Sequence, residues 1–220
     1  MNQIDPRLSS RRLRLLAVGG LLLALVACSA LRPAATPHPS FHMLDGDAAS
    51  GSAAAPLAPA GAPTLIVNPP HAAAGFDSQR IIYVREAHQL EYFAHNEWVD
   101  PPARMLAPPL VAAIARSGAF RAVLPTPSAA AGEMRLDTEV IRLQHEFGAP
   151  PSRVRFTLRA VLVDEKTRRV LAWREFDTTV PADSEDPRGG VVAANRAVRT
   201  VLEQLSAFCA ETARRAPPAK

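Results

Sequence analysis

Two stretches of alternating residues, followed by a third predicted strand that ends at Val180, constrain the fold more than any other feature of the chain. In the second stretch, apolar side chains take one parity, while arginine and threonine take the other. A period of two predicts a half-buried strand with one wet face. In the first stretch the apolar parity switches after Val140, as a β-bulge produces. The strands are predicted at residues 134–147, 153–163 and 170–180.

Two helical patterns accompany these strands. Apolar residues recur at every third or fourth position from Val191 to Cys209, which predicts an amphipathic helix of six or seven turns. A shorter stripe follows Asp100-Pro101-Pro102, which supplies an N-cap and a proline at the first helical position. Pro108 and Pro109 fall inside this shorter helix, so we expect it to be bent or broken there.

The remaining elements complete a fold class. A short apolar strand is predicted at residues 64–67, and a hairpin with strands at 79–84 and 89–93. The order of strands, helix, strands and helix predicts an α+β fold. In it, two main helices pack on one face of a mixed sheet that is rich in antiparallel pairs. A domain of about 150 residues buries enough surface to fold without metal or disulfide.

The first residues have the organisation of an export signal. Arg11, Arg12 and Arg14 precede an uncharged run of 13 residues, 15–27. That run is too short for a transmembrane helix, which needs about 20 residues. A charged segment, a short apolar segment and a small residue before a cleavage site are typical of a secretory signal. We therefore expect residues 1–27 to be removed.

The end of this run points to lipidation. Leu25-Val26-Ala27-Cys28 resembles the lipobox of bacterial lipoproteins. The resemblance implies cleavage between Ala27 and Cys28 and acylation of Cys28, which would bind the protein to a membrane. Ser29, where retained lipoproteins usually have aspartate, resembles an outer-membrane destination. A plain secretory signal with an unmodified cysteine is the alternative.

A linker separates the expected anchor from the domain. Residues 28–63 are rich in Ala, Pro, Ser and Gly and show no apolar period, which predicts a lipidated cysteine followed by a disordered tether. The domain is expected at 64–214 and a disordered tail at 215–220. His38 and His42 lie within the tether, where solvated side chains are a better interpretation than metal ligands.

Composition and motifs exclude several function classes. The net charge is +4, but four arginines and one acid lie in the first fifteen residues, so the mature chain is close to neutral. This argues against a nucleic-acid partner. The chain has no phosphate-binding loop, nucleophile elbow or dinucleotide or zinc motif, so we expect no enzyme, cofactor or metal. His88 and His95 are interpreted as surface residues, Asp164 and Glu165 as a polar turn, and Cys209 as a buried apolar residue.

Residues 64–211 resemble the ABC-type transport auxiliary lipoprotein family. The best landmark runs from Gln89-Leu90-x-Tyr92 to Asn96-x-Trp98, and Ser117-Gly118-Ala119-Phe120 adds to it. The resemblance implies a non-enzymatic lipoprotein at the periplasmic face of the outer membrane. Its partners would be an MCE-type periplasmic protein and, through that protein, an inner-membrane ABC transporter that moves lipids or other hydrophobic compounds.

Two sets of residues are candidates for partner docking. The arginines of the middle strand could grip a partner's carboxylates, or could simply form the wet face of that strand. Exposed aromatic residues dominate interface energetics, but at least half of the aromatic candidates should belong to the core. The alternatives to transport are an activator of a cell-envelope enzyme and a periplasmic lipid carrier. The candidates are Tyr83, Tyr92, Phe93, Trp98, Arg153, Arg155 and Arg159.

Overall fold

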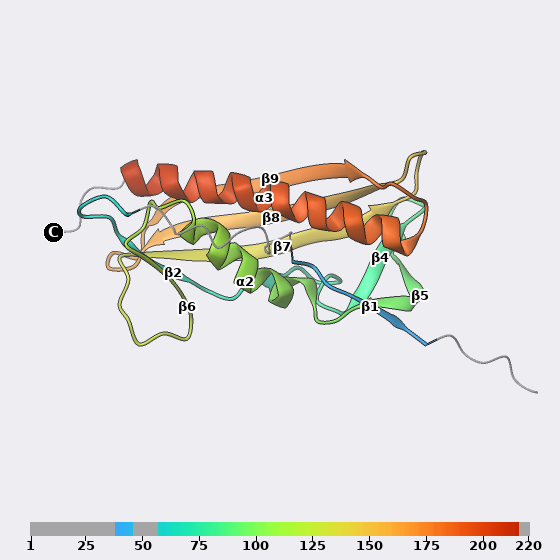
Figure 1. Ribbon diagram of the computed structural model, residues 1–220, viewed down its shortest axis with the longest axis horizontal. Coiled ribbons are helices and arrows are strands. Elements are labelled where there is room, and N and C mark those ends of the chain that lie inside the picture. Colours follow the sequence, from blue (N-terminus) through green and yellow to red (C-terminus); the bar gives the residue numbers. More distant parts are fainter. Residues whose placement is uncertain (1–37, 46–56, 216–220) are drawn as a thin grey trace, which may run out of the picture. The chain divides into compact units, whose positions relative to one another are not determined.

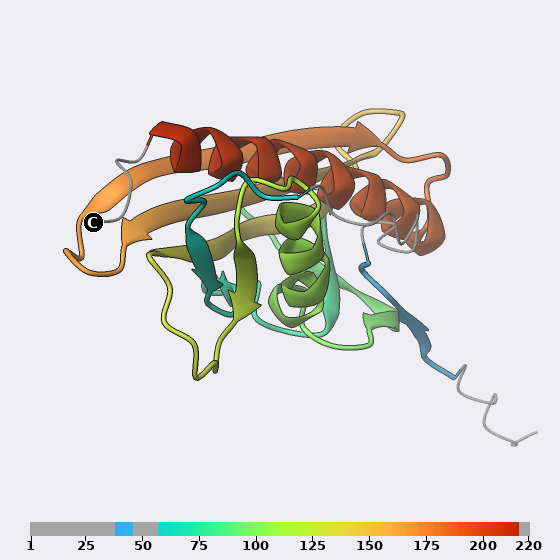
Figure 2. The ribbon, with the colours of Figure 1, turned by 60° about the vertical axis from the view of Figure 1, so that its left-hand side comes forward.

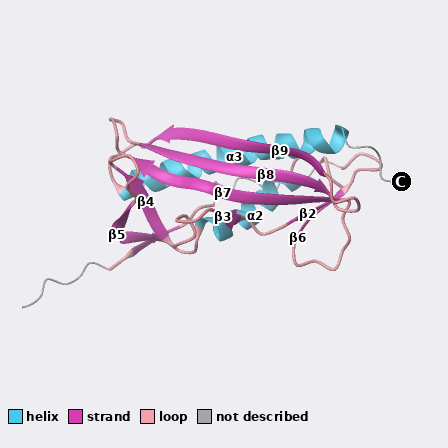
Figure 3. Ribbon diagram, turned by 180° about the vertical axis from the view of Figure 1, so that it is seen from behind, coloured by secondary structure: helices cyan, strands magenta, loops and turns pink. Residues whose placement is uncertain are grey.

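The computed structural model describes residues 38–45 and 57–215. Within these ranges the chain forms nine strands in one mixed sheet and two helices, which lie on the same face of the sheet (Figure 1). Seen from behind, the long strands lie in front of both helices (Figure 3). The predicted α+β class, with two main helices on one face, is confirmed.

The three predicted long strands form one antiparallel side of the sheet. β7 pairs with β8, and β8 pairs in turn with β9. The register between β7 and β8 shifts between Val140 and Arg142, which confirms the predicted bulge. The apolar parity of β8 is buried, and its arginine parity faces away from the core. The bounds are β7 Met134–Glu146, β8 Arg153–Asp164 and β9 Val170–Pro181.

Short strands cover the other edge of β7. β2, β3 and β4 each run parallel to β7 and pair with successive stretches of it. β6 continues the sheet beside β2, while β5 and then β1 continue it beside β4. β4 and β5 form the predicted hairpin. The bounds are β1 Ser40–His42, β2 Thr64–Val67, β3 His71–Ala72, β4 Arg80–Val84, β5 Glu91–Trp98 and β6 Ala122–Pro125.

The C-terminal helix α3, Pro187–Arg215, is the main cover of the sheet and is longer than predicted. Small buried side chains such as Ala197 let it lie close to the strands. Further along, the ring of Phe208 meets the ring of Phe176 on β9 edge-on, with centroids 5.9 Å apart. Cys209 is fully buried, as predicted, and burial raises the pKa of its thiol to about 12.

The shorter helix α2, Pro102–Ala115, packs beside α3 and against β6 (Figure 2). It runs without interruption through Pro108 and Pro109, so of the expected bend or break the break is wrong, and the bend stays a prediction. Each proline removes one backbone hydrogen bond. Burial of Leu106, Pro109 and Leu110 offsets that loss, because packing supplies most of a helix's stability in proteins.

The start of α2 differs by one residue from the expectation. Pro101 is the N-cap and Pro102 is the first helical residue, and no side chain caps the helix. Asp100, the expected cap, lies one residue too early. Its Oδ1 instead accepts a long hydrogen bond of 3.5 Å from Nη1 of Arg104. Proline suits the first helical position because its missing N–H would have no helical partner.

The folded unit begins earlier than the sequence suggests, so the tether assignment of residues 28–63 is wrong for residues 40–44. Ser40–His42 forms β1 beside β5, and Leu44 is only 2 % exposed within the core. Composition reflects only the local preferences of the chain. β1 depends instead on long-range contacts, such as the one between Nε2 of His42 and Oδ1 of Asn96, which lies 54 positions later, at 2.9 Å. Residues 1–37, 46–56 and 216–220 lie outside the described residues, and with them the expected signal, Cys28, those parts of the expected tether and the tail from 216.

α3 touches β7 at a glycine. A Cβ on Gly190 would lie 2.5 Å from Nδ1 of His145, closer than side chains approach one another. The ring of His145 is 2 % exposed, so the surrounding core leaves it little room to move. Gly190 is therefore required for space, although glycine inside a helix costs about 1 kcal/mol relative to alanine.

We expect Gly190→Ala to lower the free energy of unfolding by about 1–3 kcal/mol, because overlap with His145 outweighs the gain in helix propensity. Urea unfolding followed by circular dichroism measures the change. Gly148→Ala is the matched control, since no atom lies within 4 Å of a Cβ built there. Equal stability of Gly190→Ala and the parent would contradict the close approach.

Candidate functional site

The helices leave one face of β7, β8 and β9 uncovered (Figure 3), and the predicted arginine stripe belongs to this face. Arg153, Arg155 and Arg159 alternate along β8 with buried residues, so they project away from the helices. The structure therefore brings all three arginines to one face. What the sequence does not reveal is the set of residues beside them on the neighbouring strands.

Acidic residues of β7 and β9 neutralise two of these arginines. Nε and Nη2 of Arg155 bind the Asp177 carboxylate at 3.0 and 2.7 Å. Arg159 bridges Glu139 and Glu175 at 3.0 and 3.3 Å. The hydrogen bonds from Arg155 hold the pKa of Asp177 below its ordinary value. The stripe is thus a ladder of mixed charge, and we call these five residues the ion-pair ladder.

The ion-pair ladder contributes little to stability. Its side chains are 39–44 % exposed, and exposed ion pairs typically contribute about 0.2–1 kcal/mol each. Its main physical effect is to keep an uncovered sheet face soluble with charges at fixed positions. A protein partner with a complementary pattern of charges can recognise such fixed charges of both signs.

An exposed tryptophan lies on the same face, beyond the ion-pair ladder. Trp173 of β9 is 66 % exposed and stands opposite Val161 of β8. Val170, at the start of β9, is 59 % exposed. Sequence reasoning missed Trp173, although its parity is that of Glu175 and not of buried Phe176. An exposed aromatic residue surrounded by polar groups has the composition of a docking surface.

β9 is also an edge strand. In the described part of the sheet it pairs only with β8, so its outer backbone groups have no strand partner there. Charged residues along an edge discourage uncontrolled pairing. Arg174 supplies such a charge and also covers the core, with its guanidinium 5.1 Å from the ring centroid of Phe208.

The four predicted docking aromatics lie in different environments. Trp98 is 3 % exposed and belongs to the core, so its prediction as a docking residue is wrong. A register shift in the β4–β5 hairpin changes which parity of β5 faces inward. Tyr83 and Phe93 are half-buried and stack with centroids 4.5 Å apart. Tyr92 is 39 % exposed, and the guanidinium of Arg80 lies 4.8 Å from its ring centroid.

The hydroxyl of Tyr83 is already engaged within the hairpin. It donates to Oε2 of Glu91 at 3.0 Å, and Arg85 binds the same carboxylate. The hydrogen bond from Arg85 lowers the pKa of Glu91, while the hydrogen bond to Glu91 raises the pKa of Tyr83. Tyr83 therefore supports the hairpin, which leaves Tyr92 as the exposed member of the aromatic set.

His145 is a titratable group buried between α3 and the sheet. Its Nε2 is 2.8 Å from the hydroxyl of Ser152, while Nδ1 has no hydrogen-bond partner among the described residues. Its ring stacks on Phe147, with centroids 4.2 Å apart. Burial lowers the pKa of His145, against the opposing charges of Glu185 and Asp186. The adjoining apolar cavity of about 10 Å³ has room for at most about one water.

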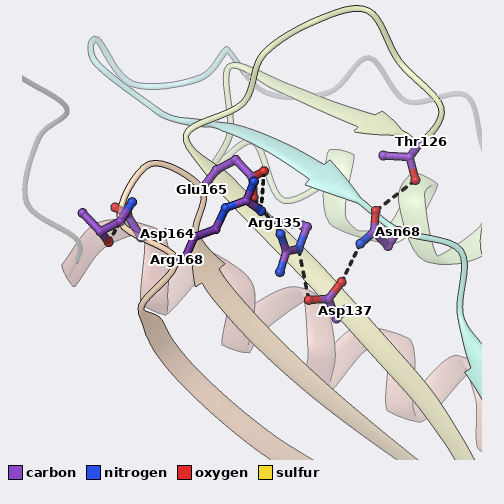
Figure 4. A network of polar contacts seen from close by, with 8 residues as sticks. Asn68, Thr126, Arg135, Asp137, Asp164, Glu165 and Arg168 are labelled. Carbon is purple, nitrogen blue, oxygen red and sulfur yellow. Dashed lines mark hydrogen bonds and ion pairs between the residues drawn. The ribbon is translucent and has the colours of Figure 1, made fainter.

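A polar network holds the other end of β7 (Figure 4). Arg135 binds Asp137 at 3.1 Å and Glu165 at 3.0 Å. Asn68, which follows β2, donates to Asp137 at 2.6 Å and accepts from Thr126 at 3.0 Å. The network joins β2, β6, β7 and the β8–β9 turn. Glu165, one of the two acids in that predicted turn, therefore has a structural role.

The described residues hold few other groups that could form a site. Over residues 38–45 and 57–215, no three His, Cys, Asp or Glu side chains gather closely enough to hold a metal ion. His88 and His95 are both exposed, in agreement with their interpretation as surface residues. Neither α2 nor α3 combines the length and the apolar character that a membrane span requires.

Comparison with known proteins gives one family and two clear structural relatives. Residues 44–206, well over half of the chain, match the family described as ABC-type transport auxiliary lipoprotein component. Protein XCC0632 from Xanthomonas campestris is 23 % identical, with a TM-score of 0.65 over 81 % of this chain and 95 % of that one. An uncharacterized protein is 15 % identical, with a TM-score of 0.58 over 80 % and 98 %. At these identities the two structures support the fold alone. Among curated proteins, none matches the chain.

We expect the free energy of unfolding to fall as the pH drops from about 7.5 to about 5, in part through His145. Burial lowers the pKa of His145 in the folded state. As the pH falls, His145 is therefore protonated at a higher pH in the unfolded chain than in the folded protein. The free energy of unfolding decreases as the pH falls through about 6.5, the ordinary pKa of histidine. Urea unfolding at several pH values measures this slope. His145→Gln should flatten it, whereas His95→Gln should not. Equal slopes for the parent and His145→Gln would count against the buried neutral ring.

Proposed function

Because the chain belongs to the family of ABC-type transport auxiliary lipoprotein components, we propose that it is a non-enzymatic outer-membrane subunit of an MCE-type transport system. In this role it lies at the periplasmic face of the outer membrane and docks the periplasmic conduit there. An inner-membrane ABC transporter drives the movement of lipids or other hydrophobic compounds. The family match over residues 44–206 is the observation that carries the proposal. That family is a class of transport accessory proteins, which supports a role without catalysis.

The proposal places the membrane anchor at Cys28. Cleavage after Ala27 would leave Cys28 as the first residue, and each acyl chain adds about 0.8 kcal/mol per buried CH₂. Ser29 supports the outer membrane as the destination. An anchored domain meets other envelope proteins at an effective concentration in the millimolar range, so a weak docking contact is sufficient.

The proposed docking surface is the uncovered face of β7, β8 and β9, centred on Trp173. Tryptophan is among the residues that most often dominate interface energetics. The ion-pair ladder extends along the same face on one side of Trp173, beginning with Arg159 and Glu175, and Arg153 lies at its far end. Such charged groups are typical of the rim of a protein interface. Arg155 and Arg159 act here through the charge pattern of the ladder, since acidic neighbours already neutralise them. Tyr92 is a second candidate contact because it is exposed.

Two other functions share the same anchor and domain. An activator of a cell-envelope enzyme would use a similar surface, so the identity of the partner separates it from transport. A lipid carrier needs a large apolar cavity, and even drug-sized ligands occupy about 300–1,000 Å³. The apolar cavity beside His145 has about 10 Å³, and the hollow of about 210 Å³ between Met43 and α3 has a mixed polar and apolar lining. Neither of these two cavities is therefore a candidate lipid site.

We expect Cys28→Ala to give a folded protein that leaves the outer-membrane fraction and no longer supports transport. The substitution removes the acylated sulfur and touches none of the contacts described above. Density-gradient fractionation of membranes measures location, and circular dichroism of the purified variant checks folding. Ser29→Ala is the matched control and should remain membrane-bound. Normal fractionation of Cys28→Ala would refute the anchor.

We expect Trp173→Ala to reduce capture of the MCE-type partner about tenfold or more, because truncating a central interface tryptophan costs about 2 kcal/mol or more. Its free energy of unfolding should change by less than about 0.5 kcal/mol, as for most surface substitutions. The measurement is crosslinking in cells, followed by affinity purification and quantitative mass spectrometry. Leu90→Ala, at a residue 41 % exposed in the β4–β5 loop, is the control.

The identity of the captured proteins decides between the functions. Enrichment of an MCE protein that depends on Trp173 supports transport. A peptidoglycan synthase in its place supports the activator. Undiminished capture of the MCE protein by Trp173→Ala would contradict this face as the docking surface, while the family-level role would stand.

A further inference from the structure

Three exposed apolar residues occupy neighbouring register positions in and just beyond the β1–β5 pair. Phe41 and Met43 are 58 % and 63 % exposed, and Val99 is 43 % exposed. β1 runs parallel to β5 with His42 opposite Trp98, and the N–H of Val99 donates to the carbonyl of His42 at 2.9 Å. Alternation along both strands directs His42 and Trp98 toward the core and the other three residues outward. We call Phe41, Met43 and Val99 the β1 patch.

The backbone of the β1 patch is fixed to the domain. Nδ2 of Asn195, on α3, donates to the carbonyl of Met43 at 3.1 Å, and the N–H of Asp45 donates to Oδ1 of Asn195 at 2.9 Å. Leu44, between them, is buried in the core. Phe41 and Met43 therefore project from an ordered segment, and a contact made by them loses little conformational freedom.

The β1 patch also follows closely on the expected anchor. Thirteen residues lead from Cys28 to Phe41, and they reach at most about 45 Å when fully extended. As a coil they would span roughly 20 Å. A bilayer with its headgroups is about 40–45 Å thick. An acylated Cys28 therefore keeps Phe41 within about one bilayer thickness of the membrane surface.

We propose that the β1 patch rests on the lipid surface in which Cys28 is anchored, with Phe41 and Met43 at the boundary between headgroups and acyl chains. This inference rests on the acylation of Cys28 in the proposed function. Apolar side chains gain free energy when they leave water, and an aromatic ring suits the membrane interface. Because the anchor presents the membrane to this edge at high effective concentration, even a small patch is sufficient.

Contact through the β1 patch gives the domain a defined orientation. Trp173 of β9 lies opposite Val161 of β8, which in turn lies opposite Asp137 of β7. His145, which pairs with β4, is eight residues further along β7. That separation is about 26 Å along the strand. The lipid contact and the proposed docking surface are therefore different surfaces, and both can be occupied at once.

A dye at position 41 tests the inference. Phe41→Cys is labelled with an environment-sensitive NBD dye in the full-length acylated protein, reconstituted in vesicles of phosphatidylethanolamine and phosphatidylglycerol. Cys209 is fully buried and Cys28 is acylated, so the dye attaches at position 41. Trp173→Cys, labelled in the same way, is the matched control at a similarly exposed site. We expect emission at shorter wavelength and quenching by nitroxide-labelled lipids at position 41 only.

A second substitution tests the neighbouring side chain. In the protein labelled at position 41, Met43→Ser should weaken both the spectral shift and the quenching. Leu90→Ser, at an exposed leucine outside the β1 patch, should leave both unchanged. Equal effects of the two substitutions would overturn the role of the patch.

The outcomes separate this inference from the proposed function. A vesicle-bound protein whose dye at position 41 stays in water overturns the lipid contact and leaves the anchor intact. A spectral shift without nitroxide quenching means that protein covers the β1 patch, and quenching at both positions means that no particular face meets the membrane; each overturns the inference. Protein that fails to float with the vesicles overturns the anchor at Cys28 and the lipid contact together.

Discussion

The packing of α3 on one face of β7, β8 and β9 is the constraint on which the rest of the structure depends. Three strands that are apolar on alternate residues require one cover, and this helix of 29 residues supplies most of it. Gly190 and the small side chains that follow it let the helix lie close enough to hold His145 between the layers. The other face of the strands has no helix over it in the described residues. It has to be kept polar, and the ion-pair ladder does this.

Features that depend on local periodicity could be predicted from the sequence, and features that depend on long-range register could not. Alternation predicts the first two of the long strands, the shift after Val140 and the outward parity of the arginines. It does not predict which acids stand beside them, because that depends on pairing across two hairpins. The two tryptophans show the same division. Trp173 lies in a long regular strand, where parity alone indicates exposure, whereas the register shift in the β4–β5 hairpin turns Trp98 inward.

The wrong boundary at Thr64 has the same physical origin. Residues around Ser40 are surrounded by Ala and Pro and have little tendency to form a strand alone. They become β1 because β5 offers backbone partners 56 positions away and because the core accepts Leu44. The sequence feature that indicates this strand is the run Phe41-His42-Met43-Leu44, which places large side chains inside a stretch made mostly of small residues.

The short segment between Cys28 and β1 limits how far an anchored domain could move from the membrane. With a tether of about 35 residues the domain could search up to about 110 Å from the membrane for its partner. With β1 docked on β5, only eleven residues separate Cys28 from Ser40. In the proposed role, an anchor at Cys28 would therefore keep the domain close to the bilayer. In the proposed role, a periplasmic conduit must then extend to the membrane, because the lipoprotein cannot extend to the conduit. A fixed position also makes orientation useful, since a docking face centred on Trp173 meets the conduit reproducibly only if another surface holds the domain against rotation.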